Sequence, residues 1–336
     1  MIAAQIRSPL ESDLLETAEP GVGPRDVLIE VKNAGVCGTD LHIWHGSYAL
    51  AAYPVVPGHE FSGVVAAVGE QVQNFSVGER VTADPNLPCY SCVFCQQRQF
   101  NQCLNLEVVG VTRSGAFSRY VVVPESAVYS IGELPFSEAA LLEPLACVVW
   151  GLKQVQLQAG DTMLIFGAGP MGLLMLQAVL RAGAASVVIV DKESGRLRLA
   201  ASLGATTFQA DDLSPGILKD FAPHGFDVVA DATGVPQVIE GTFAYVKPGG
   251  KIWVFGVAAG DARVPFSPFE VFRKDLKVIG SFALNKTFHE AISLVRGGAL
   301  TLAPLISHTL PIREFERGLG LAERDPKRLK IQFAFE

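Results

Sequence analysis

Short runs of Val and Ile, broken by Gly and Pro, fill the first half of the chain. Such runs occupy residues 26–36, 61–70, 79–84 and 118–125, where apolar residues alternate or cluster over the length of a strand. This spacing is typical of several short strands folded into a barrel or a sandwich. The pattern therefore predicts a β-rich domain at the start of the chain.

The pattern changes near Leu157, where wholly apolar strands begin to alternate with helical segments. Residues 163–167 predict a strand and 169–183 a helix, and a second strand (186–191) and helix (194–203) follow. Apolar strands that alternate with helices indicate a parallel sheet covered on both faces. Further strands are predicted at 205–210, 227–232, 251–256 and 277–282, which gives the six strands of a Rossmann-type sheet.

The tail from about Phe288 predicts a helix over 288–298 and then short strands. It is too small to form a domain, so we expect it to return to the first one. The fold class expected is α/β plus β. A β-barrel domain would comprise 1–153 and 290–336, and a Rossmann nucleotide-binding domain 154–289.

Composition narrows the function. The 336 residues are 49% hydrophobic and 18% charged, which suits two globular domains, and the net charge of −7 argues against a nucleic-acid partner. Residues 163–180 carry no charge, but three glycines and Pro170 interrupt them, so we interpret them as strand, turn and buried helix, with no membrane association. The N-terminus shows no signal peptide, and we expect a cytoplasmic protein.

A glycine motif marks the nucleotide site. Gly167, Gly169 and Gly172, with Pro170 and Met171 between them, form G-x-G-x-x-G after a strand and at the start of a helix. In this context the glycines allow a tight turn, close approach of a pyrophosphate, and helix–strand packing, while the helix N-terminus attracts phosphate.

Asp191 ends the second strand, where a carboxylate can accept hydrogen bonds from an adenosine ribose and repel a 2′-phosphate. This predicts NAD rather than NADP, although Lys192 and Arg196 could each reach a phosphate. Further along, the strand ends predict Thr233, within Asp231–Gly234, on the adenosine side and Val257, after Phe255 and Gly256, near the nicotinamide.

Four of the six cysteines fall within fifteen residues, as Cys89-x2-Cys92-x2-Cys95-x7-Cys103. Thiolates at this spacing close a tetrahedron around Zn²⁺ and leave no position for water, so we predict a structural zinc site. A second group, Cys37 with His59 and Glu60, offers ligands that suit a zinc ion with an open position, although a buried thiol and a core histidine would give the same pattern.

Longer strings make a resemblance specific. GVCGTDLHIWHG, PVVPGHEFSGVVAAVG, the four-cysteine loop, LLEPLAC and IFGAGPMG stand in this order along the chain. The sequence resembles the medium-chain zinc-dependent alcohol and polyol dehydrogenases over essentially its whole length. The resemblance implies a GroES-like barrel, a Rossmann domain, two zinc ions per chain, and a homodimer or homotetramer formed through the nucleotide domain. For that contact the strand 251–256 could pair edge to edge.

The resemblance also implies roles for single residues. Cys37, His59 and Glu60 would hold the catalytic zinc, and Glu143 would lie by the metal as a ligand or through water. Thr39 and His42 would relay the alcohol proton. Asp40 would orient the site or cap a helix, while His45 is expected on the surface and Cys147 in the core.

The expected reaction oxidises a secondary alcohol with NAD⁺. The motifs are closest to those of sugar-alcohol dehydrogenases, but Ala283-Leu284 replaces an Arg-Tyr pair that many sorbitol-type members carry, so a pentitol or short polyol is expected. L-Threonine and 2,3-butanediol remain alternatives. Trp44, Tyr48, Phe117 and Phe282 are pocket candidates or core aromatics.

Two other classes of protein share part of this pattern: a nucleotide-binding structural protein of the same fold, and a zinc-ribbon regulator that binds nucleic acid. The retained metal ligands and relay residues argue against the former. The negative charge argues against the latter.

Overall fold

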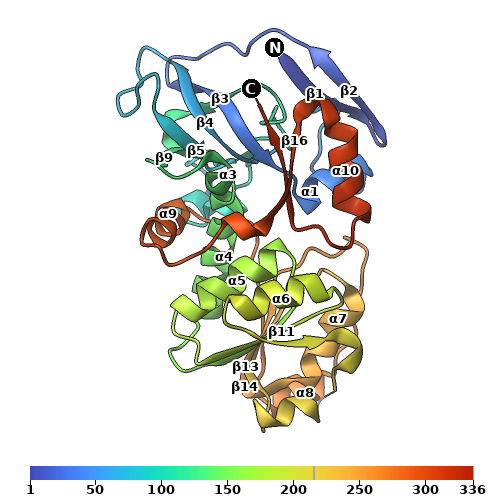
Figure 1. The fold of residues 1–336 in the computed structure, drawn as a ribbon. Helices are drawn as coiled ribbons and strands as arrows, with labels where there is room; N and C mark the ends of the chain where they lie inside the picture. The colour runs from blue at the N-terminus through green and yellow to red at the C-terminus, as the bar shows by residue number, and fades with distance from the viewer. Residues whose placement is uncertain (215, 336) are drawn as a thin grey trace. The chain divides into compact units, whose positions relative to one another are not determined.

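The computed structural model describes residues 1–214 and 216–335, and the chain divides into two compact units (Figure 1). One unit comprises Met1–Ala146 and Asn285–Glu336, and the other comprises Cys147–Leu284. The chain therefore leaves the first unit once and re-enters it at Asn285. These transitions come several residues before the expected domain boundaries at 153/154 and 289/290.

The first unit is built on a mixed sheet whose strands come from both ends of the chain. Within the described residues the strand order is β16-β17-β3-β4-β5-β9, with β8 also paired to β3. In Figure 1 the red C-terminal strands lie beside the blue and cyan strands of the first hundred residues. The bounds are β3 Asp26–Gly35, β4 Glu60–Val68, β5 Arg80–Ala83, β8 Tyr120–Pro124, β9 Val128–Ser130, β16 Ile306–Pro311 and β17 Lys330–Ala334.

Two small antiparallel pairs complete this unit's strands. The strands β1 (Ile2–Ser8) and β2 (Glu11–Glu16) form a hairpin that the hydrophobic pattern did not predict. The strands β6 (Asn86–Leu87) and β7 (Glu107–Val108) pair across the four-cysteine segment and close its base.

The helices of the first unit are short and cover the ends of the sheet. Phe117, Phe315 and Phe333 meet in its core with ring centroids 5.1–5.6 Å apart. Phe117 is completely buried there, as a core aromatic would be. The helices are α1 Gly38–Trp44, α2 Val93–Gln96, α3 Phe136–Ala139, α9 Phe288–Arg296 and α10 Phe315–Arg324, and α4 (Leu142–Val155) crosses into the second unit.

The second unit confirms the predicted parallel sheet. Its described strands run in the order β12-β11-β10-β13-β14-β15, which is the Rossmann order, and every neighbouring pair is parallel. The strands are β10 Thr162–Phe166, β11 Ser186–Asp191, β12 Thr206–Gln209, β13 Phe226–Asp231, β14 Val246–Val254 and β15 Lys277–Gly280. The helices are α5 Pro170–Arg181, α6 Ser194–Ser202, α7 Pro236–Gly241 and α8 Pro268–Arg273.

The strand order corrects one expectation. The segment 251–256 belongs to β14, which is paired on both sides, by β13 and by β15. A strand with both edges paired cannot add a strand from another copy, so β15 is the open edge at this end of the sheet. Among the described helices, none is long and apolar enough to cross a membrane.

Candidate active site and metal centres

Cys37 stands at the junction of a strand and a helix. It follows the end of β3 and caps the N-terminus of α1, where its own N–H donates to Asp40 Oδ2 at 2.8 Å. Asp40 Oδ1 accepts from the Gly58 N–H at 3.3 Å and lies 3.7 Å from His59 Nδ1. Asp40 therefore caps the N-terminus of α1 and also faces Nδ1 of the His59 ring. The other ring nitrogen, Nε2, is then the one available to a metal ion.

Glu60 lies beside Cys37 because β3 and β4 pair in register. Gly35 is the direct partner of Glu60 across the two strands. A Cβ placed on Gly35 would lie 2.3 Å from Glu60 Oε2, so the absence of a side chain there is what makes room for the carboxylate. The same carboxylate accepts from Lys330 Nζ at 2.8 and 2.6 Å.

The ligand atoms of Cys37, His59 and Glu60 all lie within 4.8 Å of one another. Burial favours a neutral imidazole, but the charges of Asp40 and Cys37 raise the pKa of His59 well above its usual value. Negatively charged groups therefore face the His59 ring. A thiol, an imidazole and a carboxylate are a donor set that suits zinc, so these residues fit the expected catalytic ion.

Glu143 lies on the first turn of α4 and is buried, with 7% of its surface exposed. It is outside the close group of three ligands, but its charge acts on both His59 and Lys330 and raises the pKa of each. Glu143 thus belongs to the same electrostatic environment.

Thr39 and His42 lie three residues apart on α1, a spacing that places both on one face of a helix. His42 Nδ1 lies 3.2 Å from Ser47 Oγ. His45 is on the surface as expected, where its Nε2 lies 2.8 Å from Glu323 Oε1. Trp44 and Tyr48 are half-buried and pack against the core, and burial together with the charge of Cys37 raises the pKa of Tyr48.

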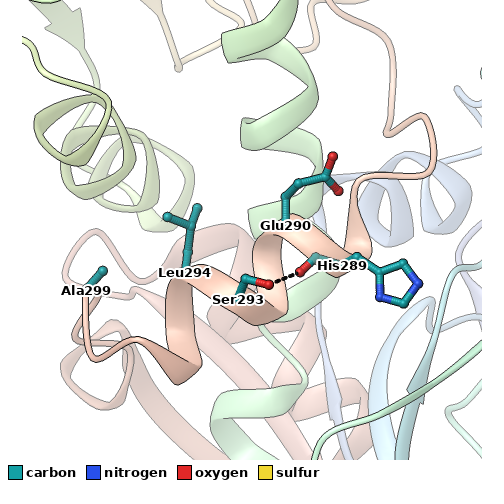
Figure 2. Close-up of a pocket in the computed structure, with 5 residues that line it drawn as sticks. All are labelled: His289, Glu290, Ser293, Leu294 and Ala299. Atoms are coloured by element: carbon teal, nitrogen blue, oxygen red, sulfur yellow. Dashed lines mark hydrogen bonds between the residues drawn. The ribbon is translucent and has the colours of Figure 1, made fainter.

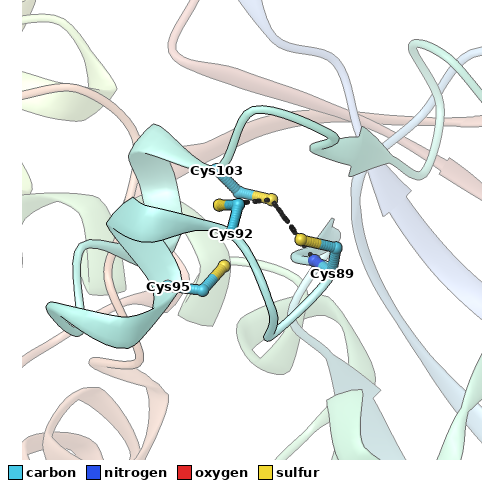
Figure 3. A group of neighbouring side chains, drawn as sticks. All are labelled: Cys89, Cys92, Cys95 and Cys103. Atoms are coloured by element: carbon cyan, nitrogen blue, oxygen red, sulfur yellow. Dashed lines mark hydrogen bonds between the residues drawn. The ribbon is translucent and has the colours of Figure 1, made fainter.

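The four cysteines of the predicted structural site converge in one loop (Figure 3). Sγ of Cys103 lies 3.5 Å from Sγ of Cys89 and 3.9 Å from Sγ of Cys92. Thiolates bound to one tetrahedral zinc ion at about 2.3 Å stand roughly 3.8 Å apart, so this spacing fits zinc.

Backbone N–H groups of this loop also donate hydrogen bonds to its cysteine sulfur atoms. The N–H groups of Cys89 and Asn105 donate to Cys103 Sγ at 3.3 and 3.4 Å. Hydrogen bonds from Ser91 and from backbone N–H groups lower the pKa of Cys89 to about 5, whereas burial and the neighbouring thiols raise the pKa of Cys95 to about 12. Donors aimed at sulfur stabilise thiolates, the form that ligates zinc.

The glycine motif of the second unit lies at the carboxyl end of β10. Gly167 has a φ of +102°, and a Cβ on Gly172 would lie 1.8 Å from Gly167 O, so the turn and the close packing both require glycine. A Cβ on Gly169 would meet no atom within 4 Å. Open space at Gly169, with Pro170 and Met171 starting α5 behind it, fits a phosphate at the helix N-terminus.

Asp191 has a contact role that the sequence did not reveal. Its Oδ2 accepts from the Ala168 N–H at 2.6 Å and its Oδ1 from the Glu193 N–H at 2.8 Å, so it ties the glycine loop to the end of β11. Each carboxylate oxygen keeps a second lone pair for a ribose hydroxyl. Arg196 Nη1 lies 3.8 Å from Asp191, while Lys192 is exposed.

Thr233 and Val257 follow β13 and β14, and so lie at the same edge of the sheet as Gly167 and Asp191. Asp231 is completely buried and accepts from the N–H groups of Thr233 and Gly234 at 3.0 Å. Asp231 therefore shapes the loop that presents Thr233. Val257 is 66% exposed.

Comparison with known proteins decides the family. Residues 23–133 match the alcohol dehydrogenase GroES-like domain, and residues 170–297 match the zinc-binding dehydrogenase family. The D-altritol 5-dehydrogenase of Agrobacterium fabrum is 39% identical over 96% of each chain. The chain belongs to the zinc-dependent medium-chain alcohol/polyol dehydrogenase family.

Other relatives of this dehydrogenase agree. The D-arabinitol dehydrogenase 1 of Uromyces fabae is 34% identical and covers 99% of this chain and 97% of its own. A zinc-binding dehydrogenase from Sinorhizobium meliloti, solved with NADP bound, is 30% identical with a TM-score of 0.93 over 99% of each chain. The β-rich unit is thus GroES-like and the other Rossmann-like, as expected.

The structure of the dehydrogenase adds a residue that the sequence did not single out. Lys330 is 4% exposed, on β17, and donates to Glu60 and to Val36 O at 3.1 Å. The only hint in the sequence that Lys330 is unusual is its place at the start of the strand KIQFA. Nothing in that segment identifies Glu60, 270 residues away, as its partner. Cys147, expected in the core, is half-buried.

An open hollow of this dehydrogenase lies along α9 (Figure 2). It is lined by His289, Glu290, Ser293, Leu294 and Ala299. None of these residues belongs to either cysteine-containing group, so the hollow has no part in the candidate site.

Proposed function

We propose that this enzyme oxidises a secondary hydroxyl of a sugar alcohol with NAD⁺ as the hydride acceptor. The observation that carries the proposal is the close group of Cys37, His59 and Glu60, on a chain that also carries the glycine loop and Asp191. A glycine loop between a strand and a helix is typical of dinucleotide binding, and a Cys–His–carboxylate group suits zinc.

Cys37 and His59 would hold the catalytic zinc ion, with Glu60 or Glu143 as the carboxylate ligand. When bound there, zinc supplies Lewis-acid chemistry, which makes an alcohol hydroxyl more acidic. The Asp40 carboxylate faces His59 Nδ1 at 3.7 Å, and Lys330 donates to both oxygens of Glu60. Glu143, whose charge acts on His59, would lie by the metal as a ligand or through a water molecule.

Thr39 and His42 would carry the hydroxyl proton away. A threonine hydroxyl both accepts and donates, so Thr39 can pass a proton on without holding a charge. His42, whose half-buried ring contacts Ser47, can accept the proton as a general base and release it to solvent.

The dinucleotide would lie at the carboxyl edge of the parallel sheet. Gly169 and the N-terminus of α5 would contact the pyrophosphate, with Thr233 on the adenosine side and Val257 near the nicotinamide. Asp191 favours NAD, because its carboxylate would repel a 2′-phosphate. Arg196 lies beside Asp191 and reduces that preference without reversing it.

A second zinc ion would occupy the four-cysteine loop, where its role is structural because four thiolates fill the coordination shell. All six cysteines are free thiols rather than disulfides in the structure. Thiolate sites of this kind require a reducing compartment, so we place the enzyme in the cytoplasm.

The substrate proposal rests on the two polyol dehydrogenases that resemble this chain, which are named for altritol and arabinitol. Ala283-Leu284 stands where a larger hydroxyl clamp is expected, which favours a pentitol or a short polyol. L-Threonine and 2,3-butanediol are the alternatives. Self-association would use β15, the open sheet edge, next to the exposed rings of Phe269 and Phe272 on α8.

The deciding experiment is NADH formation, followed by near-ultraviolet absorbance, with pentitols, hexitols, 2,3-butanediol, L-threonine and simple alcohols. We expect turnover with a polyol, and loss of turnover when a chelator removes zinc. Turnover with L-threonine alone would reject the polyol proposal. If zinc-loaded protein turned over no member of the panel, the polyol proposal would fail in favour of an unusual alcohol substrate or of a nucleotide-binding structural protein.

A further inference from the structure

The four-cysteine loop is held from outside by the residue at which the chain re-enters the first unit. Asn285 Nδ2 donates to Arg98 O at 2.9 Å, and Asn285 Oδ1 accepts from the Phe100 N–H at 3.1 Å. Arg98 and Phe100 lie between Cys95 and Cys103, in the longest spacer of the loop. One amide side chain therefore pairs with the loop backbone as a neighbouring strand would.

The next residue makes a second attachment. Lys286 Nζ lies 3.3 Å from Asp84 Oδ2 and 5.6 Å from the centroid of the Tyr90 ring. Asp84 is 1% exposed and also accepts from the Asn86 N–H at 2.9 Å, directly before the loop begins. Lys286 thus joins the start of the loop, through Tyr90, to the buried carboxylate at its base.

The backbone on both sides of this contact is strained. Tyr90, Arg98, Ala283 and Lys286 all have positive φ, between +50° and +61°, although none is glycine. Side chains in the left-handed region persist only where the surrounding structure fixes them. Asn285 and Lys286 contact the loop at two of these positions, Arg98 O and the Tyr90 ring.

We propose that Asn285 and Lys286 form a clasp that positions the four-cysteine loop for its zinc ion, and that the zinc ion in turn orders the chain at its return into the first unit. Both residues are positioning residues, since neither carries a metal ligand. The inference rests on the proposed structural zinc. Coupling between two binding events is reciprocal, so the clasp should stabilise zinc by the same factor by which zinc stabilises the clasp.

The first test measures zinc release. Zinc content per chain is determined by mass spectrometry of the metal for the wild type and for Cys92→Ser. An unchanged content in Cys92→Ser would refute zinc in the loop itself, separately from the clasp. Release to a chromophoric chelator is then followed in a His59→Ala background, which removes the other candidate zinc ion, so that the signal comes from the loop.

In that background we expect Asn285→Ala to release zinc roughly tenfold faster, because two hydrogen bonds to the loop are lost. The matched control is Asn74→Ala, which removes an amide hydrogen bond to Glu125, outside the loop. Lys286→Met should accelerate release as well. Equal release rates in Asn285→Ala and Asn74→Ala would overturn the clasp.

The second test leaves Asn285 and Lys286 unchanged. It therefore still tests the clasp if Asn285→Ala does not fold. Hydrogen exchange is measured in His59→Ala protein, with and without loop zinc, on the peptide covering 283–291. We expect removal of zinc to increase exchange in this peptide, because the coupling between loop and return segment acts in both directions. Unchanged exchange there, with faster exchange in 89–105 alone, would show that the loop and the return segment are independent.

Discussion

The ammonium group of Lys330 holds both carboxylate oxygens of Glu60, at 2.8 and 2.6 Å, in a pocket where the two side chains are 4% and 1% exposed. Burial favours a neutral amine, but the charges of Glu60 and Cys37 raise the pKa of Lys330 above its usual value. The pair joins the last strand of the chain to the candidate metal site, so Lys330 on that strand helps to hold the site together.

Breaking this pair should be costly. In Lys330→Met the Glu60 carboxylate stays buried without its counter-charge, and we expect a loss of about 3–5 kcal/mol of stability. The double variant Glu60→Gln/Lys330→Met should recover much of that loss, because neither charge then remains buried. Thermal midpoints of the wild type, both single variants and the double variant check this, and additive losses would contradict it.

His59→Ala should abolish turnover and leave the fold intact, since the candidate catalytic ion supports chemistry rather than packing. The expected result is one zinc ion fewer per chain, with a far-ultraviolet circular dichroism spectrum like that of the wild type. Unfolding of the variant would contradict the expectation that this ion serves the chemistry while the ion of the four-cysteine loop serves stability.

Cys92→Ser should lower the thermal midpoint before it affects the chemistry, because an ion bound by four thiolates staples the segment between β6 and β7. Cys147→Ser is the matched control, since Cys147 belongs to neither metal group. A melting curve for Cys92→Ser that superimposes on those of the control and the wild type would argue against a structural ion in the loop.

Asp191→Ala should narrow the preference for NAD over NADP by roughly tenfold, as expected when a charged hydrogen-bond acceptor is removed. Because Asp191 also holds the Ala168 N–H, the KM for both cofactors should rise. The informative quantity is therefore the ratio of kcat/KM for NAD to that for NADP. A ratio equal to that of the wild type would reject Asp191 as the residue that reads the ribose.

Asp227 makes part of the stability depend on pH. Burial alone would raise its pKa, but hydrogen bonds from Lys247 and from the Thr162 N–H and Oγ1 lower the pKa below 3.8. A carboxyl whose pKa is lower in the folded state stabilises the fold fully at higher pH, and that contribution disappears as the pH falls below about 3.8.

We therefore expect Asp227→Asn to be less stable than the wild type at pH 7, with a difference in urea midpoint that shrinks as the pH falls from about 4 toward the folded-state pKa. Asp220→Asn, a change at an exposed aspartate of the same unit, is the control. A difference that stayed constant across this range would contradict the linkage.

The sequence by itself determined the elements and much of the chemistry. Residues 187–190 are apolar throughout, and only a sheet covered on both faces buries every residue of such a run, so the parallel sheet could be predicted. The glycine motif and the four-cysteine group could also be predicted from the sequence. Their geometry is set by residues that lie close together along the chain.

Tertiary structure alone decided the contacts between distant residues. Nothing local links Lys330 to Glu60 or Asn285 to Phe100, because the register of β17 against β3, and of β3 against β4, is a property of the folded sheet. Strand order likewise decided that β15, and not the strand containing 251–256, is the open edge. A periodic pattern reports which face of a strand is buried, but the partner that buries it exists only in the fold.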